Sequence, residues 1–343
     1  FNFRFCVFEA AQILARNSPL STEMSQSLCK DLSLALARFP KIRLGHLPTP
    51  LEPLDRLSEI LGGPRLWVKR DDCTGLSSGG NKTRKLEFSM ADAQAKSADT
   101  IVTHGTIESN RACQTAGAAA KLGLGCNIVL EERSGVVKDS YALSGNALLN
   151  HLHGACVSKF EPSVDISAEI ACLANQLIQD GKTPYIIPTG GSDCVGALGY
   201  VNCARELAEQ AADFGLEIDA LVHAADSAGT QAGLLVGLAA IQSDIHLLGI
   251  GVRAAQDQQE QLVFNLAHRT AQHLGTGVKI ARKDVHVNCG YVGAGYGLPS
   301  DGMVRSIKLL AQTGGLLFDP VYSGKGLDGL ITLVKQGYFA GMN

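Results

Sequence analysis

From about residue 66 onward, the chain alternates short runs of apolar, β-branched residues with long amphipathic stretches. The short runs predict buried strands, and the amphipathic stretches between them predict helices. Regular alternation of this kind is typical of parallel sheets whose faces are covered by helices. The pattern therefore predicts an α/β protein built from parallel, twisted sheets.

The predicted elements follow one another closely. We expect strands over 66–69, 100–103, 127–130, 155–159, 185–188, 220–223, 247–252 and 316–318, and helices over 82–96, 110–122, 167–180, 194–212, 229–241, 256–273, 300–312 and 326–336. Glycine, serine and threonine are concentrated where a strand leads into a helix. In open α/β sheets, ligands bind at such junctions, beyond the carboxyl ends of the strands.

The length and charge of the chain limit its possible functions. At 343 residues, it is longer than one hydrophobic core usually supports, so we expect two lobes. The net charge of −3 gives no general attraction to nucleic acid or to an anionic membrane. No run of apolar residues is long enough to predict a membrane span. Any anion must therefore be held by a local site.

The ten cysteines are scattered, without a CxxC pair or a His–Cys cluster at zinc spacing. We therefore expect no disulfides, no metal site and a reducing, cytoplasmic location, with organellar targeting left open. The chain begins with Phe1, and Glu9 and Glu23 interrupt a segment that resembles neither a clean signal peptide nor an acid-free transit peptide. Residues 1–38 are treated as an extension of uncertain status.

The segment from Ser78 to Glu87 places two glycines directly before a predicted helix that carries Lys82 and Lys85. Because the two lysines are three residues apart, they share one face of that helix. One amine can form a Schiff base with an aldehyde while the other meets a phosphate. The glycines allow backbone N–H groups to approach an anion at the positive helix end. Taken alone, a basic first turn is more often only a solvated surface.

Four further strand–helix or glycine-rich junctions carry polar groups. Ser109 and Asn110 open one predicted helix, and the run from Asp226 to Gly233 resembles a second phosphate cradle. Tyr296 and Tyr322 place phenols beside glycines. Each junction taken singly is compatible with an ordinary turn.

In order and spacing, these motifs resemble those of the pyridoxal-phosphate enzymes of the tryptophan synthase β type, or fold type II. The chain is most similar to the D-cysteine desulfhydrase and 1-aminocyclopropane-1-carboxylate deaminase family. The resemblance implies a pyridoxal 5'-phosphate cofactor, a small amino-acid substrate and a homodimer. It also implies a large cofactor-binding domain over 39–85 and 193–343 and a small domain over 86–192. It runs from Phe39 to the end of the chain and is carried by the segments Pro48–Leu51, Lys69–Asp72, Gly79–Phe88 and Asp319–Lys325.

The resemblance implies a role for each site residue. Lys82 matches the Schiff-base lysine and Lys85 the phosphate-side lysine, while Asn110 faces the ring oxygen of the cofactor. The implied catalytic residues are Lys82, Ser109, Tyr296 and Tyr322; the implied cofactor-binding residues are Asn81, Lys82, Lys85, Asn110, Ser227, Ala228, Gly229, Thr230, Tyr322 and Ser323; and the implied substrate-binding residues are Ser109, Asn110 and Arg253.

The residue after Tyr322 distinguishes chemistries within this family. Ring-opening deaminases resemble one another in having Glu there, whereas Ser323 is a neutral partner for the pyridine nitrogen, as in sulfur-eliminating members. Arg253 follows a predicted strand and can pair with a sulfonate. The resemblance thus implies a carbon–sulfur lyase of the L-cysteate sulfo-lyase type, which forms pyruvate, sulfite and ammonia. D-Cysteine desulfhydration is the alternative, and a ring-opening deaminase or a catalytically silent homologue is less favoured.

The chain departs from the family pattern at several positions. Glu108 and Arg111 stand where Gln and His are usual, and we expect Glu108 to repel a substrate carboxylate and Arg111 to offset it. Asp226 stands where the phosphate loop usually has Gly, and its charge is expected to disfavour a phosphate. The sequence ends at Asn343, before a segment expected to complete the pocket, so a truncated C-terminus is expected.

Overall fold

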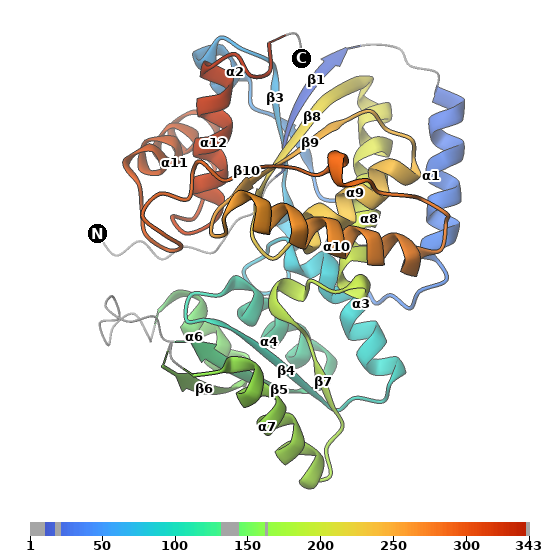
Figure 1. Cartoon of the computed structure of the whole chain (residues 1–343), viewed down its shortest axis with the longest axis vertical. Helices are drawn as coiled ribbons and strands as arrows, with labels where there is room; N and C mark the ends of the chain where they lie inside the picture. Colours follow the sequence, from blue (N-terminus) through green and yellow to red (C-terminus); the bar gives the residue numbers. More distant parts are fainter. Residues whose placement is uncertain (1–10, 18–21, 132–143, 162–163, 341–343) are drawn as a thin grey trace.

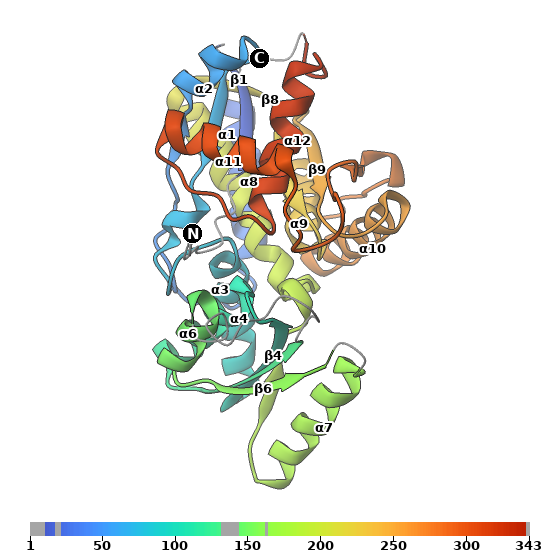
Figure 2. The same cartoon turned by 90° about the vertical axis from the view of Figure 1, so that its left-hand side faces the viewer.

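Two sheets form the framework of the computed structural model, which describes residues 11–17, 22–131, 144–161 and 164–340. The larger lobe contains a six-stranded sheet in the order β10-β9-β8-β1-β3-β2, and the smaller lobe a four-stranded sheet in the order β6-β5-β4-β7 (Figure 1). Figure 2 shows the small lobe below the large one, with α7 at its outer end. The α/β class predicted from the alternation is confirmed.

The large lobe is assembled from both ends of the described chain. Its strands are β1 (Ala11–Asn17), β2 (Leu51–Pro53), β3 (Leu66–Lys69), β8 (Leu216–Ala225), β9 (His246–Gly251) and β10 (His286–Asn288). Its helices are α1 (Thr22–Leu36), α2 (Asp55–Leu61), α8 (Cys194–Phe214), α9 (Gly229–Ala240), α10 (Gln256–Leu274), α11 (Asp301–Gly314) and α12 (Ser323–Lys335).

The small lobe comes from the middle of the chain. Its strands β4 (Thr100–Thr106), β5 (Gly125–Glu131), β6 (Cys156–Phe160) and β7 (Pro184–Ile186) are all parallel. Its helices are α4 (Asn110–Leu122), α6 (Gly145–Leu152) and α7 (Ile166–Gln179). Helix α3 (Lys82–Ala95) packs against both α8 and α4, so it joins the two lobes. The domain boundaries given above stay a prediction, and α3 runs across the one between residues 85 and 86.

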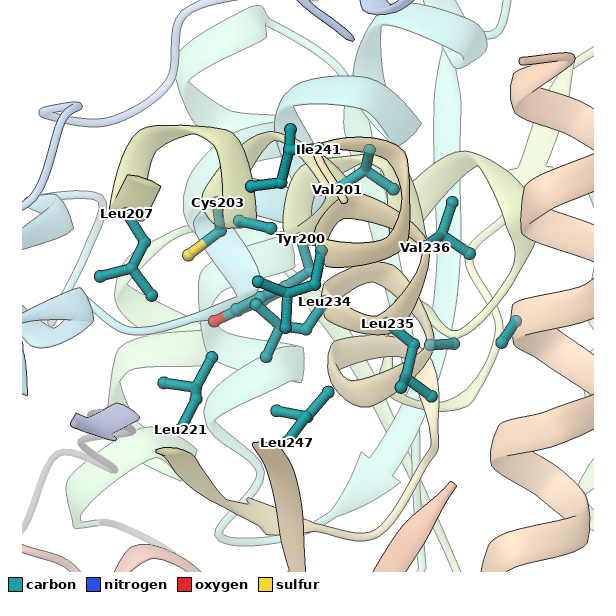
Figure 3. Close-up of a cluster of buried hydrophobic side chains, with 14 of the residues drawn as sticks. Tyr200, Val201, Cys203, Leu207, Leu221, Leu234, Leu235, Val236, Ile241 and Leu247 are labelled. Atoms are coloured by element: carbon teal, nitrogen blue, oxygen red, sulfur yellow. The ribbon is translucent and has the colours of Figure 1, made fainter. Parts of the chain in front are cut away.

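Alternate residues of β8 serve two separate cores of the large lobe. Leu221 packs with α8, α9 and α10, whereas Ala220 and Val222 pack on the opposite face with α2 and α12. Figure 3 shows Leu221 and Leu247 meeting apolar side chains of α8 and α9. Because side chains alternate across a strand, one buried apolar strand can support helices on both faces.

Part of the N-terminal extension belongs to the large sheet. Strand β1 lies between β3 and β8 and runs antiparallel to both, so that Ala11 is opposite Lys69 and Gln12 is opposite Val222. The large sheet is therefore mixed, while β8, β9 and β10 keep the expected parallel order. The strand–helix alternation begins only near residue 66, so no pattern in the sequence placed this upstream strand.

All predicted helices, and all predicted strands but one, correspond to elements of the structure. The prediction of a strand over 316–318 is wrong, because this segment pairs with no strand. Its apolar residue Phe318 instead packs in the core beside α12. The short strands β2 and β10 and the helices α1, α2 and α6 have no predicted counterpart. In the described part of the chain, no helix combines the length and apolar character needed to cross a bilayer.

A buried ionic network fixes the start of α3. The guanidinium of Arg84 donates hydrogen bonds of 2.8 to 3.0 Å to Asp71 and of 2.9 Å to both carboxylate oxygens of Glu206 on α8. Lys69 also pairs with Glu206, and the hydroxyl of Tyr200 donates to Asp71 at 2.6 Å. Two cations and two carboxylates thus balance one another away from water, where each charge depends on its partners.

We predict that Glu206→Gln lowers the free energy of unfolding by about 3–5 kcal/mol, because it leaves Lys69 and Arg84 buried with one carboxylate fewer. Burial raises the pKa of Glu206, but the hydrogen bonds and charges of Arg84 and Lys69 outweigh it and hold the pKa at about 2. The ordinary value is about 4.3, so the stabilising effect is present above that pH and lost as the pH falls toward 2.

Urea unfolding at a series of pH values measures both effects. The matched control is Glu209→Gln on the same helix, since Glu209 is exposed and its ion pair with Arg205 contributes less than about 1 kcal/mol. An unfolding free energy that falls no further in Glu206→Gln than in Glu209→Gln would contradict the account.

Candidate active site

A cavity of about 230 Å³ lies where the carboxyl ends of strands from both sheets face each other. Strands β4 and β7 end at it from the small lobe, and β8 and β9 from the large lobe. The strand–helix junctions singled out in the sequence therefore meet at one place. The cavity is lined by Asn81, Lys82, His104, Gly105, Thr106, Glu108, Ser109, Asn110, Arg111, Glu131, Thr189, Gly190, Asp226, Ser227, Arg253, Tyr296, Val321 and Tyr322.

Lys82 is the first residue of α3, and its side chain lines the cavity. The amine donates a 2.9 Å hydrogen bond to Oδ1 of Asn81 and lies 5.8 Å from the ring centroid of Tyr322. The hydroxyl of Tyr322 donates to the carbonyl of Ala224 at the end of β8, at 3.2 Å, which holds the ring in place. A primary amine and an aromatic face thus lie together in the cavity.

Next to the amine, backbone and hydroxyl groups form a cradle suited to an anion. Ser227 lines the cavity and precedes the N-terminus of α9, and its hydroxyl accepts a 3.0 Å hydrogen bond from Ser192. Ser192 in turn accepts from the N–H of Gly229 at 3.1 Å. Ala228 has a φ of 69°, a conformation that non-glycine residues seldom adopt. The helix N-terminus and these hydroxyls favour negative charge.

Lys85 lies next to this cradle and is not among the residues that line the cavity. Its side chain is buried, and its amine donates a 3.0 Å hydrogen bond to the carbonyl of Gly190. A Cβ atom added at Gly229 would lie 2.9 Å from the Lys85 amine, which shows how close the amine lies to the start of α9. The structure thus brings Lys85 and the segment 227–230 together, as the sequence implied.

The small lobe contributes the N-terminus of α4. Ser109 is the N-cap of this helix, because its hydroxyl accepts a 3.2 Å hydrogen bond from the N–H of Ala112. Asn110 begins the helix, and both residues line the cavity. Tyr296 lines it from the large lobe. All the residues expected to be catalytic, Lys82, Ser109, Tyr296 and Tyr322, are therefore brought together.

Ser323 is not among the residues that line the cavity. Its hydroxyl donates to the buried carboxylate of Asp319, which also accepts from the N–H groups of Val321, Tyr322 and Ser323. Burial raises the pKa of Asp319 although these hydrogen bonds lower it. Ser323 starts α12 directly after Tyr322, and its contact with a cofactor ring stays a prediction.

Arg253 and Asp226 meet across neighbouring parallel strands. Nε of Arg253 lies 2.7 Å from Oδ1 of Asp226, and the guanidinium carbon lies 5.8 Å from the ring centroid of Tyr296. The sequence predicts separate roles for the two charges: Arg253 as a partner for a sulfonate, and Asp226 as a charge that disfavours a phosphate. In the structure, each offsets the other.

Several residues of the cavity were missed from the sequence. His104 and Thr189 are joined by a 2.6 Å hydrogen bond between Nε2 and Oγ1. Burial, together with the charge of Arg111, lowers the pKa of His104 to about 4, so the imidazole is neutral at neutral pH. Both residues directly follow predicted strand segments. Because ligands in open α/β sheets bind beyond the carboxyl ends of the strands, the residue after each predicted strand is a candidate, and this criterion would have found both.

The arrangement suits an aldehyde cofactor that carries a phosphate. The Lys82 amine can hold the aldehyde, the Tyr322 ring can cover a flat ring, and the cradle at α9 can hold the phosphate. A Cβ atom at Gly190 would lie 1.9 Å from the Ser227 hydroxyl, so the cradle depends on a bare backbone there. Among the described residues, no group of His, Cys, Asp or Glu side chains could hold a metal ion.

Comparison with known proteins agrees with this geometry. The family model described as "Pyridoxal-phosphate dependent enzyme" matches residues 42–342. The D-cysteine desulfhydrases of Salmonella choleraesuis and Salmonella paratyphi C are each 42% identical to the chain over 304 residues, which cover 89% of the chain and 91% of each relative.

Solved structures give the same result. An "ACC deaminase homologue" has a TM-score of 0.80 and 35% identity, and the match covers 89% of this chain and 90% of the other. A threonine deaminase from T.th. has a TM-score of 0.57 and 16% identity over 91% of this chain and 93% of its own, which shows a shared fold. The chain therefore belongs to the family of pyridoxal-phosphate dependent enzymes, in the D-cysteine desulfhydrase and ACC deaminase group, and its cofactor is pyridoxal phosphate.

Proposed function

We propose that this enzyme is a carbon–sulfur lyase that converts D-cysteine and water to pyruvate, hydrogen sulfide and ammonia. The observation that carries the proposal is the Lys82 amine, which lies in a cavity together with Ser109, Asn110 and Tyr322, beside an anion cradle. The similarity to D-cysteine desulfhydrases over 89% of the chain supports this substrate. It favours D-cysteine over L-cysteate, which the sequence patterns put first.

In this proposal, the side chains divide the work of binding and proton transfer. The chemistry that pyridoxal phosphate would supply here is an electron sink, which would acidify the Cα–H bond and labilise the substituent on Cβ. Lys82 would hold the cofactor through its aldehyde, and the Lys82 amine would take the Cα proton of the substrate. Ser109 and Asn110, at the positive end of α4, orient the substrate next to that amine.

Other residues would hold the cofactor or lie near the substrate. Ser227, Ala228, Gly229 and Thr230 would hold the phosphate at the start of α9, with Lys85 behind them adding positive charge. Tyr322 would cover the ring of the cofactor, and Tyr296 would place its phenol near the substrate. The two lobes enclose the reacting bonds between them.

A second candidate substrate, L-cysteate, is favoured by one observation. Arg253 lines the cavity and lies against both Asp226 and Tyr296, so a guanidinium is present where a β-substituent can reach it. A sulfonate would have to share this guanidinium with Asp226. L-Cysteate therefore remains second to D-cysteine.

We predict that the purified holoenzyme releases pyruvate and sulfide from D-cysteine, and that Lys82→Ala lowers kcat by about 10³-fold or more, because the variant lacks both the cofactor anchor and the base. The control is Lys96→Ala just past the end of the same helix, since the Lys96 side chain is exposed and pairs with Asp92, away from the cavity. Sulfide and keto acid are assayed separately. Absence of pyruvate and sulfide from D-cysteine would overturn the proposal, and parallel assays with L-cysteate and 1-aminocyclopropane-1-carboxylate would then show whether either is the substrate.

For Arg253→Gln, we predict that KM for L-cysteate, if it is turned over, rises at least about 10-fold more than KM for D-cysteine, because only the sulfonate adds a charge-assisted contact. Steady-state kinetics with both substrates measure the ratio. Equal increases would remove Arg253 from sulfonate recognition.

We predict that Gly190→Ala weakens cofactor binding by about 10-fold or more, because Gly190 has a φ of 72° and the new Cβ would displace the Ser227 hydroxyl. The control is Gly181→Ala, which has a similar φ of 77° but nothing within 4 Å of the added Cβ. Equilibrium titration of each protein with pyridoxal phosphate gives the dissociation constants. Equal constants for the two variants would contradict the cradle.

A further inference from the structure

Arg111 is a buried cation in the wall of the cavity. It is the second residue of α4, its side chain lines the cavity, and only 6% of the residue is exposed. One terminal nitrogen donates 2.9 Å hydrogen bonds to the hydroxyl of Thr103 and to the carbonyl of Pro188. The other lies 3.6 Å from where a Cβ at Gly105 would be. Both acceptors are neutral.

No carboxylate of the described residues lies within ion-pair distance of this guanidinium. Burial lowers the pKa of Arg111 to about 10, although the charges of Tyr296 and Asp226 act to raise it, so Arg111 still carries its charge at neutral pH. We expected Arg111 to offset the repulsion between Glu108 and a substrate carboxylate. Among the described residues, Arg111 and Glu108 form no ion pair with each other. A buried charge is costly unless an opposite charge meets it, which indicates that the partner is a ligand.

The other cationic groups of the cavity have different tasks. The proposed function assigns Lys82 to the cofactor, and Arg253 pairs with Asp226. Arg111 also lies in the first turn of α4 beside Ser109 and Asn110, where the helix end itself favours an anion. The buried charge of Arg111 and the positive end of α4 therefore lie at the same side of the cavity, and both favour an anion there.

We propose that Arg111 binds the carboxylate of the amino-acid substrate and is a specificity-determining residue of this enzyme. The inference rests on the proposed function only in taking an amino acid as the ligand of the cavity. Glu108 and Glu131 line the same cavity, so its wall carries both positively and negatively charged side chains. Such a wall suits a zwitterionic amino acid better than a simple anion.

Two unreactive ligands isolate the carboxylate. D-Alanine lacks the thiol of D-cysteine, and D-alaninol replaces the carboxylate of D-alanine by a hydroxymethyl group. Calorimetric titration of the holoenzyme should show D-alanine binding at least about 10-fold more tightly than D-alaninol, because a charge-assisted hydrogen bond is lost in the second. In Arg111→Gln, we expect this preference to disappear through weaker binding of D-alanine. In Arg111→Lys, it should be kept in part, because the charge remains.

The matched control is Arg205→Gln on α8, which removes a guanidinium that pairs with Glu209 outside the cavity and should keep the preference for D-alanine. An unchanged visible spectrum of the bound cofactor and an unchanged unfolding transition show that Arg111→Gln is folded, and Arg111→Lys supplies the test if it is not. A full preference for D-alanine in a folded Arg111→Gln, or its loss in Arg205→Gln, would overturn the inference. A wild-type enzyme with this preference that does not cleave D-cysteine would contradict the proposed function and support the role of Arg111.

Discussion

The position of the whole site depends on the buried guanidinium of Arg84. It lies between Lys82 and Lys85 in the first turn of α3, and it ties that turn to Asp71 and to Glu206 on α8. Because α8 packs on α9, the same contacts fix the distance from the Lys82 amine to the N-terminus of α9. A flexible lysine is thus carried by a turn that several charge-assisted hydrogen bonds hold in one place. The network acts on the site through position, without contributing a group to the cavity.

The second constraint is topological. Parallel strands end at the same edge of a sheet, and the two lobes turn these edges toward each other, so short loops from distant parts of the chain meet. Asp226 and Arg253 show the effect, since they follow the neighbouring strands β8 and β9 and form an ion pair. Their opposite charges cancel within the cavity. Arg111, which has no such partner in the described part of the chain, remains available to an anionic ligand.

Much of this could be predicted from the sequence because its signals are local. Strand–helix alternation indicated the fold class, and the Gly79–Lys85 segment with its distant partners indicated one site for Lys82, Ser109, Asn110 and Tyr322. What could not be predicted depends on neighbours in space. The insertion of β1 between β3 and β8, the Asp226–Arg253 pair and the bond of Ser323 to Asp319 all join residues that are far apart in sequence or that have several possible partners. The same holds for Arg111, because only the three-dimensional arrangement of the described residues shows that none of their carboxylates forms an ion pair with it.

The central claim is that the amine of Lys82, and not that of its neighbour Lys85, holds the cofactor in the cavity between the lobes. Reduction of the holoenzyme with sodium borohydride attaches the cofactor permanently to the amine that holds it, and peptide mapping by mass spectrometry then locates the modified lysine. The account predicts the pyridoxyl group on Lys82. A group on Lys85 or on any other lysine would contradict it.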